Sequence, residues 1–328
     1  MKITDVTTAA SEGHGMHLWV KVETDAGITG IGECVHGEKQ VIAILHDLRR
    51  QLIGRDPFAI DAIFEELRRA QVFNGGFAGA LITALTGLDL ALWDLKGKAL
   101  GVPVYELLGG KFRDRIRVYA DCQVDPRTPL DEVDAFAEGV LERGFSALKI
   151  DVDGGDAPHK DCEEFSLMWL EEPVPPENVA AMRAVKAAST TPICAGENLY
   201  LRHGFRELIE TQAVDIIMPD IPKCGGLSEC RKIANQAELY YLPFAPHNVA
   251  SPIGTMASAH VCASVPNFLI IEFHWMHRDY WTTIVDDKRD IIQDGYIAMS
   301  DRPGIGVDLD EAVAKQYQVP GTTWFEPS

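Results

Sequence analysis

The stretch LMWLEEP (residues 167–173) is a short apolar run that ends on two adjacent carboxylates, Glu171 and Glu172. The pattern recurs towards the C-terminus in PICAGEN (192–198), VDIIMPD (214–220), LPFAPH (242–247) and NFLIIEF (267–273). These runs reach a polar residue at Glu197, Asp220, His247 and Glu272, at successive intervals of 26, 23, 27 and 25 residues counted from Glu171. Amphipathic segments separate the runs, so the pattern predicts a parallel sheet with right-handed helical crossovers.

The even spacing predicts a (β/α)8-type TIM barrel rather than an open doubly wound sheet. No GxGxxG motif follows the first strand, as a dinucleotide-binding sheet would require. Two further strands precede the repeat, in RIRVYADCQ (115–123) and SALKID (146–151), and they end near Asp121 and Asp151. Barrel active sites lie at the C-terminal ends of the strands, so we expect the polar strand ends to meet there. Carboxylates crowded at one rim repel each other unless a cation lies among them.

One unit of the barrel is missing from this pattern. Seven strands are visible in the sequence, whereas a closed barrel of this type has eight. Asp151 and Glu171 are 20 positions apart, about 30 fewer than two units of roughly 25 residues each would need. We therefore expect the third strand and its helix to be absent here. Either this sequence lacks a segment of the protein or the deletion is genuine. We favour the first, because a genuine deletion leaves two unpaired strand edges.

Residues before 115 have a different pattern, which predicts an α+β domain. Alternating apolar and polar residues in ITDVTTAA (3–10) and HLWVKVETDAGITGIGEC (17–34) indicate strands, and Asp25-Ala26-Gly27 is a hairpin signal within the second run. Helical periodicity follows over residues 38–54, 56–73 and 77–101. We expect a small antiparallel sheet followed by three helices.

The composition excludes several classes of partner. A net charge of −19 counts against nucleic acid and anionic membranes, since both require a basic surface. No apolar run reaches the ~18 residues needed to span a bilayer, and MKITDVTTAA is not a signal-peptide pattern. The seven cysteines are odd in number and scattered without a CxxC pair. We therefore expect a cytoplasmic protein whose thiols are reduced and mostly buried as small apolar side chains.

Five motifs, in the order LKID, WLEEP, AGEN, IIMPDIPKCGGLSE and FAPHN, resemble the mandelate racemase and muconate lactonizing enzyme branch of the enolase superfamily. Within that branch the chain looks most similar to acid-sugar dehydratases of the gluconate and galactonate type. The resemblance covers nearly the whole chain. It implies an α+β capping domain over residues 1–114, a barrel over 115–298, and a segment, 299–328, that returns to the cap. It also implies a homo-oligomer.

The resemblance assigns roles residue by residue. It makes Glu171 and Glu197 ligands of Mg²⁺, His247 and Asp220 the family's His–Asp dyad, and Glu272 its carboxylate on strand eight. The family's third metal ligand, an Asp, would lie on the missing third strand.

The Lys-x-Lys motif that the family often has on strand two is only half present. Lys149 matches the first lysine, but Asp151 stands where the second would be. This departure counts against a lysine-based racemase, which has bases on both faces of its substrate.

The residue types point to the same chemistry. Hard oxygen ligands suit Mg²⁺, which would stabilise the enediolate formed when a proton leaves the α-carbon of a bound acid. His247, oriented by Asp220, can exchange that proton near neutral pH. Lys149 suits a substrate carboxylate oxygen or proton transfer, and Glu272, if protonated, suits an enediolate oxygen.

The predicted reaction is therefore the Mg²⁺-dependent dehydration of a sugar acid to a 2-keto-3-deoxy acid. Either His247 or a residue on the missing strand would assist departure of the β-hydroxide. Two alternatives stay open: a racemase, epimerase or cycloisomerase of a 2-hydroxy acid, and a catalytically inactive barrel if strand three is truly deleted. Glu172 is expected to be structural, and His274 and His277 to line a pocket or belong to a closing loop.

Overall fold

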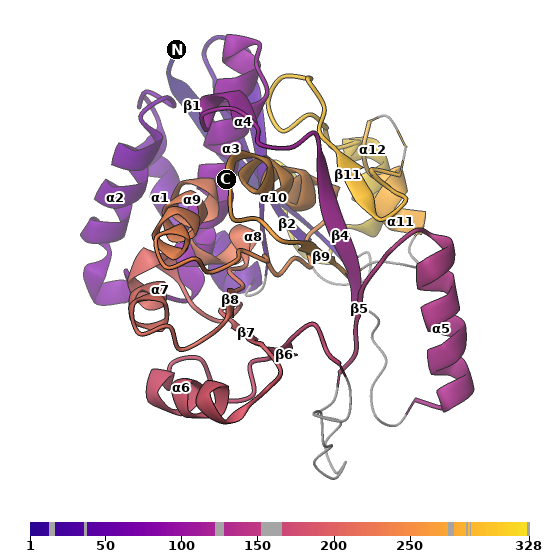
Figure 1. The fold of residues 1–328 in the computed structure, drawn as a ribbon. Coiled ribbons are helices and arrows are strands. Elements are labelled where there is room, and N and C mark those ends of the chain that lie inside the picture. Colours follow the sequence, from indigo (N-terminus) through magenta and orange to yellow (C-terminus); the bar gives the residue numbers. More distant parts are fainter. Residues whose placement is uncertain are drawn as a thin grey trace.

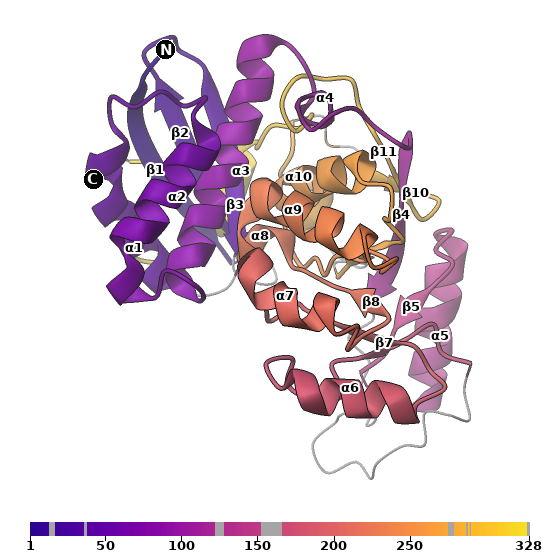
Figure 2. The same cartoon turned by 60° about the vertical axis from the view of Figure 1, so that its left-hand side comes forward.

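The structure, a computed structural model, describes residues 1–12, 17–35, 38–121, 128–151, 166–274, 279–286, 288 and 290–326. An antiparallel sheet with three helices forms the N-terminal part, and a curled, mostly parallel sheet with surrounding helices forms the rest (Figures 1 and 2). His277, which is expected to line a pocket or belong to a closing loop, lies outside the described residues, as do Cys122 and Cys162.

The N-terminal sheet contains β1 (Ile3–Ser11), β2 (His17–Thr24) and β3 (Thr29–Val35), paired antiparallel in that order. The hairpin between β2 and β3 turns at Gly27, whose φ of 71° lies in the left-handed region that glycine adopts without strain. Helices α1 (Glu38–Leu52), α2 (Ile60–Ala70) and α3 (Ala80–Leu100) pack with this sheet around a common apolar core. The predicted hairpin and the three predicted helices are confirmed.

Helix α3 lies between the two parts of the molecule and is buried on nearly all sides. Its two buried acids bind the elements around it. Asp94 accepts hydrogen bonds from the backbone of Ile31 in β3 and of Ile305 near the C-terminus, both at 2.9 Å. Asp89 accepts a hydrogen bond of 2.6 Å from the hydroxyl of Ser228 in α9 (Gly226–Glu238). Because a buried carboxylate without donors is costly, the Asp94 bonds hold α3 to β3 and to the C-terminal segment, and the Asp89 bond joins the cap to the barrel.

The barrel strands run parallel in two groups. β9 (Ile271–Phe273) pairs with β4 (Arg115–Asp121), which pairs with β5 (Leu148–Lys149), while β6 (Leu170–Glu171), β7 (Ile193–Ala195) and β8 (Ile216–Ile217) form the second group. Phe244 connects the groups through isolated bridges to Ile217 and Phe268. The predicted strand at residues 242–247 is therefore only a series of isolated bridges. Pro243 and Pro246 explain this, because proline has no N–H to donate to a ladder.

Helices alternate with these strands, as the sequence predicts. They are α5 (Leu130–Glu142), α6 (Val179–Ala188), α7 (Leu201–Glu210), α8 (Ile221–Cys224), α9 and α10 (Pro252–Ser264). Short helices complete the set, namely η1 (Val72–Asn74), α4 (Val104–Leu107), α11 (Asp279–Thr283), α12 (Glu311–Ala314) and η3 (Lys315–Tyr317). The five described cysteines are buried, and no disulfide joins any of them. No helix of the described chain is long and apolar enough to cross a membrane.

The curled sheet is open at one place. Within the described part of the chain, β5 and β6 share no backbone pairing, although each pairs with its other neighbour. This is the position at which the sequence predicts the missing unit. Side chains span the opening instead, since Lys149 Nζ lies 2.8 Å from Glu171 Oε1. Ile150 and Met168, beside the two strand edges, are 46% and 39% exposed.

The C-terminal residues contact both parts of the molecule. β10 (Ile292–Gln293) and β11 (Tyr296–Ala298) form a hairpin that extends the sheet antiparallel to β4. Further on, Gln318 and Trp324 form isolated bridges with Ser11 and Ala9 of β1. These contacts agree with a segment that returns to the cap. The domain boundaries 1–114, 115–298 and 299–328 stay predictions.

Candidate active site

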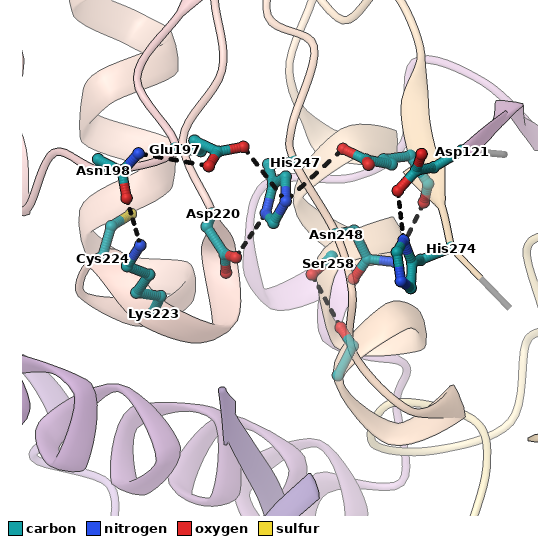
Figure 3. A network of polar contacts seen from close by, with 12 residues as sticks. Asp121, Glu197, Asn198, Asp220, Lys223, Cys224, His247, Asn248, Ser258 and His274 are labelled. Atoms are coloured by element: carbon teal, nitrogen blue, oxygen red, sulfur yellow. Dashed lines mark hydrogen bonds and ion pairs between the residues drawn. The ribbon is translucent and has the colours of Figure 1, made fainter. Parts of the chain in front are cut away.

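His247 and Asp220 form a hydrogen-bonded pair at the C-terminal end of the parallel sheet. Asp220 directly precedes α8, and its backbone forms a parallel bridge with that of His247. The imidazole Nδ1 lies 2.7 Å from Asp220 Oδ2 (Figure 3). When Nδ1 donates to this carboxylate, Nε2 is the ring atom that serves as acceptor. Nε2 lies 3.3 Å from Glu197 Oε2 and 3.9 Å from Glu272 Oε2.

The acids around His247 stabilise its charged form. Burial disfavours the imidazolium, but the negative charges of Glu272, Asp220 and Glu197 outweigh it and raise the pKa of His247 to about 10. The arrangement therefore places a basic imidazole directly beside three carboxylates. A cation bound among these carboxylates would offset part of their negative charge and so lower the pKa of His247 again.

Glu171 and Glu197 face each other from neighbouring strands. Glu197 follows β7 after Gly196, whose φ of 137° and whose closeness to Phe205 exclude a side chain there. The two carboxyl groups lie close enough for the charge of Glu197 to raise the pKa of Glu171. Burial raises the pKa of Glu171 to about 7, although Lys149 opposes this. Burial acts in the same direction on Glu197, but His247 and Lys149 outweigh it and lower that pKa.

Lys149 and Glu272 complete the predicted set. Lys149 Nζ lies 2.8 Å from Glu171 Oε1 and 3.4 Å from Glu272 Oε1. Burial disfavours the charged ammonium group, but the negative charges of Glu272 and Glu171 outweigh burial and raise the pKa of Lys149 above its ordinary value. Glu272 is fully buried, which raises its pKa, and it accepts a hydrogen bond of 2.8 Å from Tyr119. All six residues predicted from the sequence thus belong to one connected cluster of side chains.

Asp151, next to this cluster in sequence, is exposed. Glu172 turns away from Glu171 at a φ of 38° and accepts hydrogen bonds from Gly196 N at 3.0 Å and Asn198 Nδ2 at 2.9 Å. Asn198 in turn accepts a bond of 3.0 Å from Lys223. The structural role expected for Glu172 agrees with these contacts, because they hold the turn that carries Glu197.

The sequence reasoning missed a second His–Asp pair. His274 Nδ1 is hydrogen-bonded to Asp121 Oδ2, and each of these residues offers a ligand atom within 4.8 Å of one on Glu272 (Figure 3). The signal that could have revealed it is the closure of the barrel, which makes the strands ending at Asp121 and Phe273 neighbours. These three residues could hold a metal ion by their spacing alone.

The donor chemistry distinguishes the two places where a cation could bind. Mg²⁺ prefers carboxylate oxygens and water, and is commonly held by one or two protein carboxylates. Glu171 and Glu197 meet this requirement, since they are two carboxylates on neighbouring strands that lie close enough to shift each other's pKa. At the other cluster, the Nδ1 atom of His274 is engaged by Asp121, and imidazole suits transition metals better than Mg²⁺. Glu171 and Glu197 therefore fit Mg²⁺ better.

Two family descriptions match the chain. "Mandelate racemase / muconate lactonizing enzyme, N-terminal domain" matches residues 5–109, and "Enolase C-terminal domain-like" matches residues 159–313. A D-xylonate dehydratase of Haloferax volcanii is 37% identical, over 99% of this chain and 91% of that protein. A D-galactonate dehydratase of Ralstonia pickettii is 33% identical, over 100% and 97%.

Solved structures show similarity to the same group of proteins. A mandelate racemase/muconate lactonizing enzyme-like protein from Rubrobacter xylanophilus is 38% identical with a TM-score of 0.93, over 99% of each chain. The 3,6-anhydro-D-galactonate cycloisomerase from Zobellia galactanivorans is 27% identical with a TM-score of 0.87, over 97% of this chain and 100% of that chain. The predicted fold class is thereby confirmed.

The match to the D-xylonate dehydratase extends over 376 residues, 48 more than the 328 of this chain, which agrees with a missing unit.

Proposed function

Because this chain belongs to the mandelate racemase and muconate lactonizing enzyme family of the enolase superfamily, we propose that it is a Mg²⁺-dependent hydro-lyase of sugar acids. The substrate is an aldonate or aldarate, and the product is a 2-keto-3-deoxy acid. The names of the D-xylonate and D-galactonate dehydratases support this class of substrate. The observation that carries the proposal is the position of the His247–Asp220 dyad, with Nε2 3.3 Å from Glu197.

Glu171 and Glu197 would hold the metal ion. When bound, Mg²⁺ supplies a positive charge that neutralises these carboxylates and favours loss of the proton next to a substrate carboxylate. Lys149 is placed to bind one oxygen of that carboxylate, since its ammonium group lies between Glu171 and Glu272. The substrate is thereby oriented with its α-carbon near His247.

His247 Nε2 removes the α-proton. Asp220 holds the ring through Nδ1 and stabilises the imidazolium that results. Glu272, with its pKa raised by burial, is placed to donate a hydrogen bond to an oxygen that gains negative charge, and Tyr119 fixes its carboxyl group. Departure of the β-hydroxyl as water then gives the enol of the 2-keto acid.

The proposal is tested with a panel of aldonates and aldarates in the presence of Mg²⁺, with the keto acid detected as its semicarbazone. We expect turnover of at least one acid, loss of turnover with EDTA, and recovery when Mg²⁺ is restored. Glu197→Gln should abolish turnover, whereas Glu210→Gln, a carboxylate on the exposed side of α7, should not. No turnover of any acid would overturn the proposal and favour a catalytically inactive barrel.

A cycloisomerase is the second candidate, because the solved cycloisomerase of Zobellia galactanivorans has a similar fold and sequence. Such an enzyme isomerises its substrate without loss of water. Mass spectrometry of the product decides between the two, since dehydration lowers the mass by one water and isomerisation leaves it unchanged. A racemase or epimerase would also leave the mass unchanged. The homo-oligomer expected from the family stays a prediction.

A further inference from the structure

We propose that His274, held by Asp121, is the catalytic acid that protonates the departing β-hydroxyl, so that the chain uses one His–Asp pair for each of the two proton transfers. This inference rests on the proposed dehydration. It assigns to a described residue the proton donor that the sequence alone leaves open between His247 and the missing third strand.

The sheet itself brings the second pair to the mouth of the barrel. β4 and β9 are parallel and pair Tyr119 with Glu272 and Ala120 with Phe273. Asp121 and His274 are the next residues in that register, at the C-terminal ends of both strands. The imidazole Nδ1 bonds to the Asp121 carboxylate, and the His274 side chain is 23% exposed. The pair therefore lies at the edge of the buried cluster, where a bound substrate could reach it.

The contacts order the groups across the mouth. Glu197, a proposed metal ligand, is 3.3 Å from His247 Nε2, and Glu272 is 3.9 Å from the same nitrogen. Ligand atoms of Asp121 and His274 lie within 4.8 Å of one on Glu272. Figure 3 shows His247 with Asp220 near the centre, Glu197 to one side, and His274 with Asp121 to the other.

This order matches the order of the reacting atoms in a sugar acid. A substrate whose carboxylate binds Lys149 and the cation that Glu171 and Glu197 would hold would have its α-carbon near His247. The β-carbon and its hydroxyl are the next atoms along the chain, in the direction of Glu272 and His274. With Nδ1 held by Asp121, His274 would transfer its proton through Nε2.

The two transfers balance. His247 Nε2 takes the proton from the α-carbon, and the electron pair of that C–H bond becomes the new carbon–carbon π bond. The bond between the β-carbon and its oxygen breaks, the oxygen keeps the electron pair, and it leaves as water with the proton from His274. The enol tautomerises to the 2-keto-3-deoxy acid. His247 has gained one proton and His274 has lost one, so exchange with solvent restores both, and no oxidant or reductant is needed.

Hydroxide is a poor leaving group, so loss of its acid should slow elimination by roughly 10²- to 10⁴-fold. Fluoride leaves without protonation. The test therefore compares two substrates, the aldonate that the wild type dehydrates and its 3-deoxy-3-fluoro analogue. The variants are His274→Gln and Asp121→Asn, and His46→Gln, an exposed histidine on α1, is the matched control.

We expect His274→Gln to lose at least about 100-fold in dehydration while fluoride release stays within about tenfold of the wild type. Exchange of the α-proton with deuterium from solvent should persist. Asp121→Asn should lose less dehydration than His274→Gln, with the same retention of fluoride release, because Asp121 only positions the imidazole. His46→Gln should change neither rate. Circular dichroism melting identifies any variant that fails to fold. If one of His274→Gln and Asp121→Asn does not fold, the other variant tests the inference.

Two results would overturn the inference while leaving the proposed function intact. One is a His274→Gln enzyme that dehydrates the aldonate at the wild-type rate, which would assign both transfers to His247. The other is an equal loss of dehydration and fluoride release in both variants, which indicates a structural role. A wild-type enzyme that dehydrates no acid would instead overturn the proposed function and this inference together.

Discussion

Lys149 and Glu171 join the two strands between which the parallel sheet is open, with Nζ 2.8 Å from Oε1. Each residue lies at the C-terminal end of its strand, β5 or β6. The same lysine reaches Glu272 at 3.4 Å on the far side of β4. One ammonium group therefore compensates two acids of the site and holds the open edges of the sheet together.

Lys149 should compete with a cation for Glu171. In Lys149→Met the carboxylates lose their compensating charge, so we expect Mg²⁺ to bind at least about fivefold more tightly, while turnover falls because the substrate carboxylate loses its partner. Isothermal calorimetry measures the affinity, and Lys39→Met on the exposed face of α1 is the control. Weaker binding of Mg²⁺ in Lys149→Met would contradict this account.

Adjacent glutamates should behave differently when neutralised. Glu171→Gln removes a proposed metal ligand, so we expect no measurable Mg²⁺ binding and a loss of turnover greater than about 100-fold. Glu172→Gln keeps an oxygen that accepts the hydrogen bond from Gly196, and we expect turnover within about fivefold of the wild type. Calorimetry and steady-state kinetics on both variants make the comparison. Equal losses in the two variants would show that the whole turn, not Glu171, is required.

His260 should make the protein sensitive to acid. The side chain is fully buried in α10, its Nδ1 accepts a hydrogen bond of 3.0 Å from Tyr105 N, and burial lowers its pKa to about 4. The unfolded chain binds a proton near pH 6.5, so stability is lost as the pH falls from about 6.5 towards 4. For one group with this shift, the free energy of unfolding falls by about 2 kcal/mol between pH 7.5 and 5.0.

The comparison with His260→Asn isolates that contribution. Asparagine offers an oxygen to Tyr105 but does not titrate, so the variant should be less stable at pH 7.5 and lose about 2 kcal/mol less on acidification. Urea unfolding at the two pH values measures both quantities, and His46→Asn should behave as the wild type. Parallel losses in His260→Asn and the wild type would exclude His260 as the source.

Asp94 should be needed to hold α3 to β3 and to the C-terminal segment. Asp94→Ala leaves the buried N–H groups of Ile31 and Ile305 without an acceptor and Lys98 without its partner at 2.8 Å. We expect the free energy of unfolding to fall by about 3–5 kcal/mol, whereas Asp47→Ala, on a carboxylate that is 88% exposed, should change it by less than about 0.5 kcal/mol. Urea unfolding provides both values. A loss below about 1 kcal/mol in Asp94→Ala would contradict the role.

The predictable part of the site depends on one rule. Glu171, Glu197, Asp220 and Glu272 could be predicted because each follows an apolar run, and parallel strands bring such ends to one rim. The family motifs then assign their roles. The pairing of Asp121 with His274 was not predicted, because it depends on closure between the first strand and the last, and the two residues are 153 positions apart in sequence. A local sequence pattern does not show that two strands so far apart in the sequence are neighbours in the sheet.

Other features depend on contacts that no local pattern encodes. Glu33 of β3 accepts hydrogen bonds of 2.8 Å from the backbone of Ser251 and Gly254 at the start of α10, more than 200 positions away. Residues 242–247 have the apolar character of a strand but contain two prolines, so pattern and hydrogen bonding conflict. The opening between β5 and β6 was predictable, because it follows from counting residues between strand ends.

The most direct test of the central claim is proton NMR of the protein with Mg²⁺ and D-xylonate or D-galactonate in deuterium oxide. We predict that the α-proton signal disappears and that the signals of a 2-keto-3-deoxy acid appear, with one deuterium at its new methylene carbon. Exchange of the α-proton without loss of water would indicate a racemase. A substrate spectrum that stays unchanged with these acids and with the rest of the aldonate and aldarate panel would contradict the assignment of a sugar-acid dehydratase.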